Sequence, residues 1–537
     1  MSQTLPDVIQ DGLARWKVHG GEHGPLPATM EVDVAIIGSG AGGGISAELL
    51  SRAGLSVLVI EEGPLRSSRH FRQLEAEAYS QLYQEAAGRK TADKAINILQ
   101  GRCVGGSTTV NWTSSFRTPE PTLNYWRQRL GLQGFEPATL APWFAQAEQR
   151  LGIADWPTDP NPNNAVLARG MEKLGLPHGR IRRNVKGCWN LGSCGLGCPT
   201  NAKQSMLVST LPTALDAGAR LYVQTRVQRL EHDGQQVHSL LCEPVGLDSA
   251  ALGGVVAQVR ARHVVVAGGA INSPALLLRS RAPDPYAQLG RRTFLHPVVL
   301  TAADFDERIE AWSGAPQTVY SDHYLGTQPI DGPLGFKLEA PPLHPLLSAT
   351  TLPDFGAGFA QALGRFPHKQ VLLALLRDGF QPDSPGGQVR LKGDGSPELD
   401  YPLTPAIWEG ARRALLAMAE IQFAAGAREV QPMHEQAPPY TSWREAQAGI
   451  AALPMKPYLT RVVSAHVMGG CALSRVPELG VVRADGRHWQ LENLSVLDGS
   501  LFPTSIGANP QLSIYGIVNK LATQLVRELG GQPVSLA

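Results

Sequence analysis

The stretch VDVAIIGSGAGGGISAELLSRAGLSVLVIEE, residues 32–62, decides the fold of this chain. It begins with a short apolar, β-branched run at 32–37, which predicts a buried strand. A glycine-rich turn follows, and apolar residues then recur at helical spacing over 45–53 and stop at a glycine, which predicts a helix. A second apolar run at 56–60 predicts another strand and ends in Glu61. This order of elements is typical of an α/β dinucleotide-binding unit.

The glycine turn has the spacing of a dinucleotide fingerprint, because Gly38, Gly40 and Gly43 stand in the pattern G-x-G-x-x-G between the strand and the helix. The first glycine permits the tight turn, the second lets a pyrophosphate approach the backbone, and the third lets helix and strand pack closely. Free N–H groups at the start of the helix favour phosphate. Glu61, about twenty residues on, is expected to bind the ribose hydroxyls. The motif alone does not distinguish NAD from FAD.

Length and composition indicate a globular protein of several domains. The chain has 537 residues, which at roughly 100 to 200 residues each predicts two to four domains. Its 48 basic and 47 acidic residues leave a net charge of +1, so we expect neither nucleic acid nor an anionic membrane as a partner. The longest apolar run, 264–278, is interrupted by glycine, asparagine, serine and proline, so we expect no transmembrane segment. The first residues lack the pattern of a signal peptide, which predicts a cytoplasmic location.

Three further regions have recognisable patterns. Asp233-Gly234 predicts a hairpin turn between strands at 227–230 and 237–241. The region from about 300 to 455 mixes apolar residues with many prolines, which fits a separate domain of sheet and loops. Residues 511–529 predict a helix, with Pro510 suited to its first turn.

Four motifs resemble those of the glucose-methanol-choline (GMC) oxidoreductases and occur in the order found in that family. They span most of residues 31–529. The second differs from the family pattern, since Arg281 stands where glycine is usual. The motifs are GRCVGGSTTVNW at 101–112, GAINSPALLLRS at 269–280, HVMGGCAL at 466–473, and Asp498-Gly499 with Asn509-Pro510.

The resemblance implies a fold, a cofactor and a domain organisation. The fold is an α/β FAD-binding Rossmann-like domain plus an α+β substrate domain built on an antiparallel sheet, and FAD is the expected cofactor. The expected domains are an N-terminal arm (1–30), a discontinuous FAD-binding domain (31–145, 205–300 and 460–537), a cysteine-rich insertion (146–204) and a substrate-binding domain (301–459). The residues assigned to FAD are Gly38, Gly40, Gly43, Glu61, Gly105, Gly106, Ser107, Asn111, Val227, Asp498, Gly499 and Pro510.

Two of these motifs also have a direct physical interpretation. Gly105 and Gly106 let the backbone lie against a planar ring, where a Cβ atom would collide. Asn509 stands at the start of a predicted helix, which is an N-cap position. In the family the same helix start points at the flavin pyrimidine, where the helix dipole would stabilise negative charge on the reduced ring.

His466 is the expected catalytic base. Oxidation of an alcohol moves a hydride from carbon while the hydroxyl proton goes elsewhere, so a base is needed beside the flavin. Neutral imidazole predominates at pH 7 and can accept that proton. Asn509 is expected to hold the substrate oxygen beside His466. Cys471, in the same motif, is expected to be a small packed residue.

A cluster of cysteines, Cys188, Cys194 and Cys198, lies on a glycine-rich loop. Three thiolates at this spacing can converge on one metal centre, whereas a structural zinc site wants four ligands. The spacing resembles that of bacterial sugar dehydrogenase subunits of the family, whose three cysteines hold a 3Fe-4S cluster. That resemblance implies a small partner subunit, a cytochrome or quinone acceptor, and a periplasmic, membrane-peripheral location. A disulfide with a spare thiol and three reduced thiols are the alternatives.

A second resemblance is to the long-chain alcohol oxidases, through CGLGCPTNAKQS and GFKLEAPPLHPLL. That branch oxidises apolar alcohols and passes electrons to oxygen. Leucines over 334–376 permit an apolar pocket, although core packing explains them equally well. We therefore expect an apolar or bulky alcohol as substrate. A non-redox flavoprotein lyase and a silent electron-transfer subunit are the other classes that the family leaves open.

Overall fold

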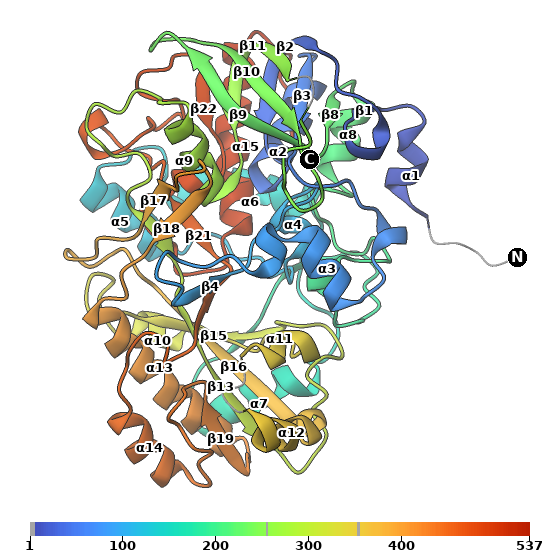
Figure 1. Ribbon diagram of the computed structural model, residues 1–537. Coiled ribbons are helices and arrows are strands. Elements are labelled where there is room, and N and C mark those ends of the chain that lie inside the picture. The colour runs from blue at the N-terminus through green and yellow to red at the C-terminus, as the bar shows by residue number, and fades with distance from the viewer. Residues whose placement is uncertain (1–5, 254–255, 352–354, 537) are drawn as a thin grey trace, which may run out of the picture.

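The structure is a computed structural model and describes residues 6–253, 256–351 and 355–536. Within these residues the chain forms two eight-stranded sheets. Figure 1 shows the first sheet in the upper part of the molecule and the second in the lower part. The described residues contain no helix that is both long and apolar enough to cross a membrane.

The first sheet is built around the stretch that the sequence singled out. Strand β2 (Thr29–Ile37), helix α2 (Ala41–Arg52) and strand β3 (Val57–Ile60) follow in that order, and the two strands pair in parallel. The strand order is β1-β8-β3-β2-β11-β10-β9, and β22 also pairs with β11. The remaining strands are β1 (Lys17–His19), β8 (Arg220–Tyr222), β9 (Thr225–His232), β10 (Val237–Pro244), β11 (Ala257–Val266) and β22 (Leu494–Val496).

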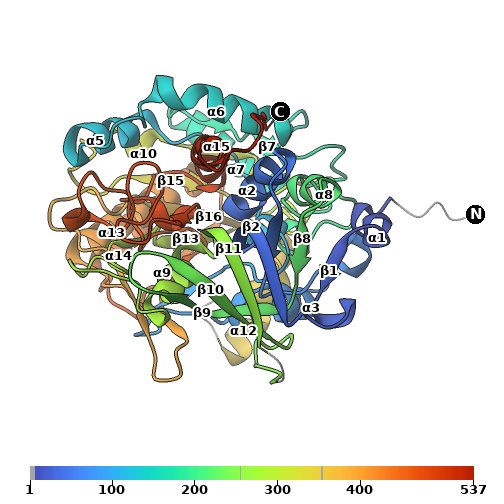
Figure 2. The ribbon, with the colours of Figure 1, turned by 90° about the horizontal axis from the view of Figure 1, so that it is seen from above.

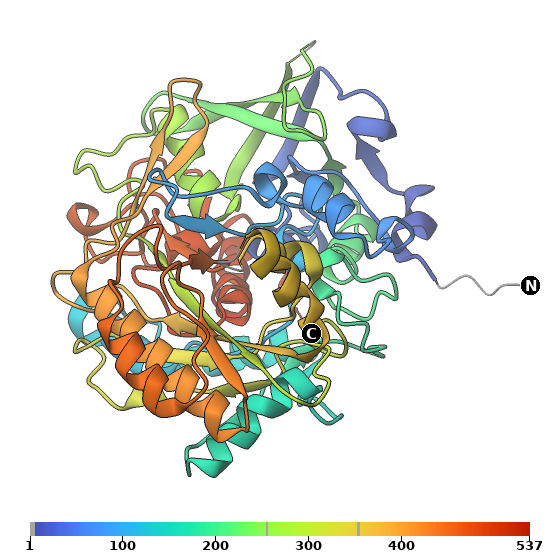
Figure 3. The ribbon, with the colours of Figure 1, turned by 60° about the horizontal axis from the view of Figure 1, so that its bottom comes forward.

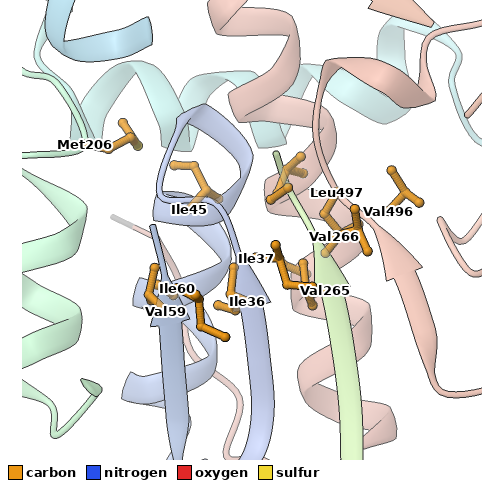
Figure 4. Packing of buried hydrophobic residues seen from close by; sticks show 14 of the residues in the cluster. Ile36, Ile37, Ile45, Val59, Ile60, Met206, Val265, Val266, Val496 and Leu497 are labelled. Carbon is orange, nitrogen blue, oxygen red and sulfur yellow. The ribbon is translucent and has the colours of Figure 1, made fainter. Parts of the chain in front are cut away.

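The core of this part forms where apolar side chains of the parallel strands meet α2. Figure 4 shows Ile36 and Ile37 of β2 beside side chains from β3, β11 and the segment around Leu497. Helix α15 (Gln511–Glu528) and helix α8 (Thr210–Asp216) pack on α2, as Figure 2 shows from above. The sequence predicted α15 as 511–529 and the β9–β10 hairpin, and both are present.

The N-terminal segment packs against the first sheet. Residues 6–30 contain helix α1 (Val8–Leu13) and strand β1, which pairs in parallel with β8 at the edge of the first sheet. Trp16 is buried and donates a hydrogen bond to Asp216. A strand of three residues in so polar a segment has no distinctive sequence pattern.

The second sheet has the order β4-β20-β13-β16-β15-β14-β6, with β19 also on β13. Helix α13 (Pro405–Ala424) packs against it and is orange in Figure 3. Its strands come from 301–459 and from segments outside that range. They are β4 (Ile96–Ile98), β6 (Gly179–Arg180), β13 (Val298–Asp304), β14 (Val319–Ser321), β15 (Phe336–Glu339), β16 (Lys369–Leu376), β19 (Glu429–Pro432) and β20 (Val462–Ser464).

The register of β16 decides which side chains share a face of this sheet. Leu373 lies opposite Leu300 of β13 and Glu339 of β15, and opposite residues of antiparallel strands point to the same side. Successive side chains alternate between the two faces. One face therefore carries Leu373 and Leu375 with Leu300 and Glu339, while Leu372 lies on the other.

Candidate active site

A cavity of about 1090 Å³ lies between the two sheets. From the first part of the molecule it is lined by the glycine turn after β2, by the segment around Gly106 and by the approach to α15. From the second part it is lined by one face of the sheet. The side chains of that face are Val298, Leu300, Ala302, Val371, Leu373 and Leu375. The cavity therefore has two sides. One is a polar backbone cradle, which consists of the glycine turn after β2, the segment around Gly106 and the approach to α15, and the other is an apolar wall.

The three glycines of the turn have different surroundings. Gly38 has a φ of +101°, and a Cβ atom there would stand 2.3 Å from the carbonyl oxygen of Ala267. A Cβ atom on Gly43 would stand 1.9 Å from the carbonyl oxygen of Gly38, so α2 can pack on β2 only through glycine. A Cβ atom on Gly40 would meet only the Cα atom of Gly106, at 3.8 Å. Gly40 lines the cavity, so the space there is left for a ligand.

Glu61 stabilises this turn. Its Oε2 accepts hydrogen bonds from the backbone N–H and the hydroxyl of Ser39 at 3.0 and 2.6 Å, and its Oε1 accepts one from the N–H of Gly63. The hydroxyl oxygen of Ser39 also accepts a hydrogen bond from the N–H of Gly105. Burial raises the pKa of Glu61. The carboxylate lines the cavity where a ribose was expected, and it also links the two glycine segments.

Two further links hold the cradle together. Asp498 accepts hydrogen bonds from the N–H of Gly269, at the start of α9 (Gly269–Arg279), and from the hydroxyl of Ser273. Asn111 donates from Nδ2 to the side chain of Gln511, the first residue of α15. These bonds join motifs that lie hundreds of residues apart in the chain.

Most of the residues that the sequence assigned to FAD line this one cavity. Gly43 and Gly105 do not line it and act in the backbone packing behind it. The assigned residues on its wall are Gly38, Gly40, Glu61, Gly106, Ser107, Asn111, Val227, Asp498, Gly499 and Pro510. His466 and Asn509 line it too.

Asn509 does not act as a helix cap, in contrast to the sequence interpretation. The residue before α15 is Pro510, and no side chain caps the helix. The Nδ2 of Asn509 donates instead to Oε2 of Glu339 on β15 at 3.3 Å. Within the described residues, Oδ1 of Asn509 and Oε1 of Glu339 are buried without a hydrogen-bond partner. Burial raises the pKa of Glu339 to about 7, against the opposing effect of Lys337.

His466 lies beside a second histidine. Its Nδ1 stands 3.1 Å from Nδ1 of His296, and the two rings are nearly perpendicular, at 88°. The Nε2 of His296 accepts a hydrogen bond from the backbone N–H of Gly507 at 3.0 Å. Burial lowers the pKa of His466 to about 4. Burial and the neighbouring His466 lower the pKa of His296 well below its ordinary value.

Within the described residues, the three cysteines of the loop form neither a disulfide nor a metal-ligand set. Cys194 accepts a long contact from Arg183, Cys198 lies 3.4 Å from the hydroxyl of Thr200, and all three have free thiols. In the part of the chain that the structure describes, no group of three or more His, Cys, Asp or Glu side chains is placed to hold a metal ion. The expected ligand set of Cys188, Cys194 and Cys198 therefore does not fit an iron-sulfur cluster in this geometry.

The cysteine loop is instead joined to the cavity wall by a buried lysine. The Nζ of Lys203 donates to the carbonyl oxygens of Thr109, Asn111 and Cys194 at 2.6, 2.9 and 2.6 Å. Burial lowers the pKa of Lys203. The loop thus supports the segment that carries Asn111 into the cavity.

His296 and Glu339 were not predicted from the sequence. The signal for Glu339 was present, because a charged residue in a short apolar strand is unusual unless it is paired. His296 carried a weaker signal, since a lone histidine beside a proline has no distinctive pattern.

These features fit a bound dinucleotide and define a class of protein. Backbone approaches closely at Gly40 and Gly106, the N-terminus of α2 faces the same space, and a polar pair, His466 and Asn509, lies opposite an apolar wall. Such a site belongs to a dinucleotide-dependent oxidoreductase. Models of the GMC oxidoreductase family match residues 79–298 and 382–517, so the chain belongs to the GMC oxidoreductase family.

Several relatives extend over nearly the whole chain. An uncharacterised GMC-type oxidoreductase of Mycobacterium tuberculosis is 32% identical over 508 residues, which are 94% of this chain and 77% of the relative. A long-chain-alcohol oxidase of Arabidopsis thaliana is 29% identical and is matched over 93% of this chain and 69% of its own length.

Solved structures share the fold at low sequence identity. One such structure is a mutant of formate oxidase from Aspergillus oryzae, which was studied for the effect of the mutation on FAD modification. It superposes on this chain with a TM-score of 0.69 at 14% identity. It covers 94% of this chain and 99% of its own. Pyridoxine 4-oxidase from Mesorbium loti gives a TM-score of 0.67 at 21% identity, over 92% of this chain and 98% of its own.

Substitutions at two glycines should separate folding from cofactor binding. Gly43→Ala forces a Cβ atom to 1.9 Å from a carbonyl oxygen, so we expect a lower melting temperature, by about 5 °C or more, with or without dinucleotide. Gly40→Ala adds the same methyl group to open space, so the apoprotein should keep its melting temperature and lose dinucleotide affinity. Thermal scans and flavin content measure both. Equal melting temperatures for the two apoprotein variants would contradict this assignment.

Ionisation of Glu339 should make stability depend on pH. The folded-state pKa of about 7 lies above the ordinary value of 4.5, so the folded state binds the proton more tightly. Stability is therefore complete below pH 4.5 and falls as pH rises through 7, by roughly 3 kcal/mol in all. Glu339→Gln cannot ionise, so its melting temperature should rise relative to wild type between pH 5 and 8. The same substitution at the exposed Glu31 should produce no such trend.

Proposed function

We propose that this protein is an FAD-dependent oxidoreductase that oxidises the CH–OH group of an apolar alcohol. The observation that carries the proposal is the continuous cavity in which the glycine cradle, His466 with Asn509, and an apolar sheet face meet. Its volume of about 1090 Å³ exceeds the roughly 300 to 1,000 Å³ of a typical single-ligand pocket, so a dinucleotide and a substrate can share it.

The cradle residues would hold FAD in this proposal. Gly40 and Gly106 leave room for the pyrophosphate and the ring system, and the N-terminus of α2 favours the phosphates. Asp498 keeps the start of α9 and Gly499 in place around the same space. Bound FAD would supply the acceptor for a hydride.

The substrate would lie between this cradle and the sheet. Leu300, Leu373 and Leu375 offer an apolar surface to a hydrocarbon chain. His466 and Asn509 line the same cavity and would contact the alcohol oxygen in this proposal. Relatives named long-chain-alcohol oxidases support the same substrate class.

Electrons are proposed to leave the flavin directly for an external acceptor, because the thiols of the cysteine loop are not gathered into a ligand set. Oxygen, a quinone and a cytochrome are the candidate acceptors. Iron and sulfide analysis of folded, flavin-loaded protein tests this point. Stoichiometric iron and sulfide would restore the cluster and the partner subunit that it implies.

Anaerobic mixing of the flavin-loaded protein with a panel of alcohols tests the main proposal. We expect apolar primary or secondary alcohols to bleach the flavin absorbance, and oxygen, quinone or ferricyanide to restore it. Cleavage of a substrate without bleaching would instead indicate a lyase. No reaction with any alcohol would favour a silent electron-transfer role.

A polar substitution in the apolar wall should discriminate between long and short alcohols. Leu373→Thr introduces a β-branched residue, which strands favour, but removes apolar contact with the substrate chain, so KM for a long-chain alcohol should rise about tenfold. KM for a short alcohol should change little, because its chain does not reach the wall. Leu363→Thr, on the exposed helix α12 (Gly356–Gly364), is the control. Equal KM changes for long and short alcohols would argue against this orientation of the substrate.

A further inference from the structure

The apolar wall of the cavity is a ladder of paired side chains on the antiparallel strands β13 and β16. Every second residue of a strand points to the same face, so one pair follows another along the cavity. The ladder begins two residues after His296, which lies beside His466. It ends in a charged pair, Asp304 and Lys369. The three apolar pairs between these ends are Val298 with Leu375, Leu300 with Leu373, and Ala302 with Val371.

Lys369 is the charged group that the cavity meets at the far end of this ladder. Its side chain is 10% exposed and lines the cavity. Asp304 does not line the cavity, and neither do its other charged neighbours, Arg365 at 3.6 Å and Glu429 on the adjacent strand β19. A ligand that extends along the ladder therefore reaches an ammonium group and no carboxylate.

Lys369 also has hydrogen-bond donors to spare. A lysine ammonium carries three N–H groups. Within the described residues its Nζ donates one hydrogen bond, to Oδ1 of Asp304 at 2.7 Å. Asp304 is shared with Arg365, so it does not depend on Lys369 alone. Two N–H groups of Lys369 are thus left for the oxygen atoms of a ligand.

The length of the ladder sets the length of a ligand that reaches this lysine. A strand advances about 3.4 Å per residue, so the distance from Val298 to Asp304 is about 20 Å. An extended hydrocarbon with C–C bonds of about 1.5 Å advances about 1.3 Å per carbon, so roughly 16 carbons span the ladder. A chain that ended there in a methyl group would take the ammonium out of water without a new partner, which is unfavourable. A terminal carboxylate would instead accept charge-assisted hydrogen bonds.

We infer that Lys369 forms a carboxylate subsite and that the preferred substrate is a straight-chain ω-hydroxy fatty acid of about 16 carbons. The inference rests on the proposed function, because it names the alcohol that the same cavity would oxidise. The hydroxyl end lies at His466 and Asn509, the hydrocarbon chain lies along the ladder, and the carboxylate accepts hydrogen bonds from Nζ of Lys369. Lys369 is thus a specificity-determining residue and takes no part in the oxidation itself.

Other charged side chains of the cavity offer weaker sites for a carboxylate. Glu435 and Arg461 line the cavity but pair with each other at 2.7 Å. Lys90 and Lys94, in the loop before β4, line it too but are exposed to water, where an ion pair contributes little. Lys369 combines a cation with burial at the end of an apolar path.

A comparison of ω-hydroxyhexadecanoate with its methyl ester tests the subsite, because the two differ only in the charge at the far end. We expect anaerobic reduction of the flavin-loaded wild type to be at least about tenfold more efficient with the acid than with the ester. Lys369→Met keeps the length of the side chain and removes its charge, so the two compounds should become equal, while the ester is still oxidised. For a shorter acid, ω-hydroxyoctanoate, wild type should show no preference over the ester, since the carboxylate does not reach Lys369.

Two lysine variants serve as controls. Lys392→Met changes an exposed turn between β17 (Gln388–Leu391) and β18 (Pro397–Asp400) and should keep the preference for the acid. Lys94→Met should keep it too, which separates binding at Lys369 from general attraction of an anion. If Lys369→Met does not fold, Lys369→Met combined with Asp304→Asn removes both members of the ion pair and takes its place.

Binding of hexadecanoate gives a measurement that does not depend on turnover, because this acid has no hydroxyl group to oxidise. By calorimetry it should bind wild-type holoenzyme about tenfold more tightly than Lys369→Met. Equal efficiency for acid and ester in wild type, or a preference that survives Lys369→Met, would overturn the subsite while leaving alcohol oxidation in place. Failure of the proposed function has a different signature, namely no flavin reduction by any alcohol.

Discussion

The close approach of two backbones at Gly43 and Gly38 is the constraint on which the rest of the structure depends. It brings the N-terminus of α2 directly behind the turn from β2, and so directs free N–H groups into the cavity. Gly42 faces the same restriction on another side, since a Cβ atom there would stand 1.7 Å from the carbonyl oxygen of Leu497. Segments from both ends of the chain are thus packed around one turn, and Glu61 holds it in shape.

Two polar residues that line the cavity, His466 and Asn509, lie on segments that connect the two parts of the molecule. His466 stands between β20, in the second sheet, and β21 (Val467–Gly469), which pairs with β12 (Thr293–Leu295). Asn509 precedes α15, which packs on α2, yet it bonds to Glu339 of the second sheet. The polar pair is therefore positioned by both sheets, and neither part of the chain could form the site alone.

The sequence predicts what is local and fails where partners are distant. Residues 32–62 contain every signal for strand, turn and helix, and the structure has these elements. By contrast, His296 and His466 are 170 residues apart, as are Glu339 and Asn509, so no window of sequence contains either pair. The N-cap interpretation of Asn509 fails for the same reason, because a distant carboxylate is its partner. The cysteine spacing likewise shows which thiols could meet, but only the fold shows whether the described thiols are placed as metal ligands.

Burial shifts the pKa values of three titratable groups, His296, His466 and Glu339, in opposite directions. Desolvation disfavours any charged form, so it lowers the pKa of His466 to about 4 and raises that of Glu339 to about 7. The neutral form of each group is therefore favoured. The same desolvation keeps His296 and His466 neutral at physiological pH, which suits a cavity whose opposite wall is apolar. Removal from water is thus the common physical cause of the neutral histidines and of the neutral carboxyl group beside an apolar wall.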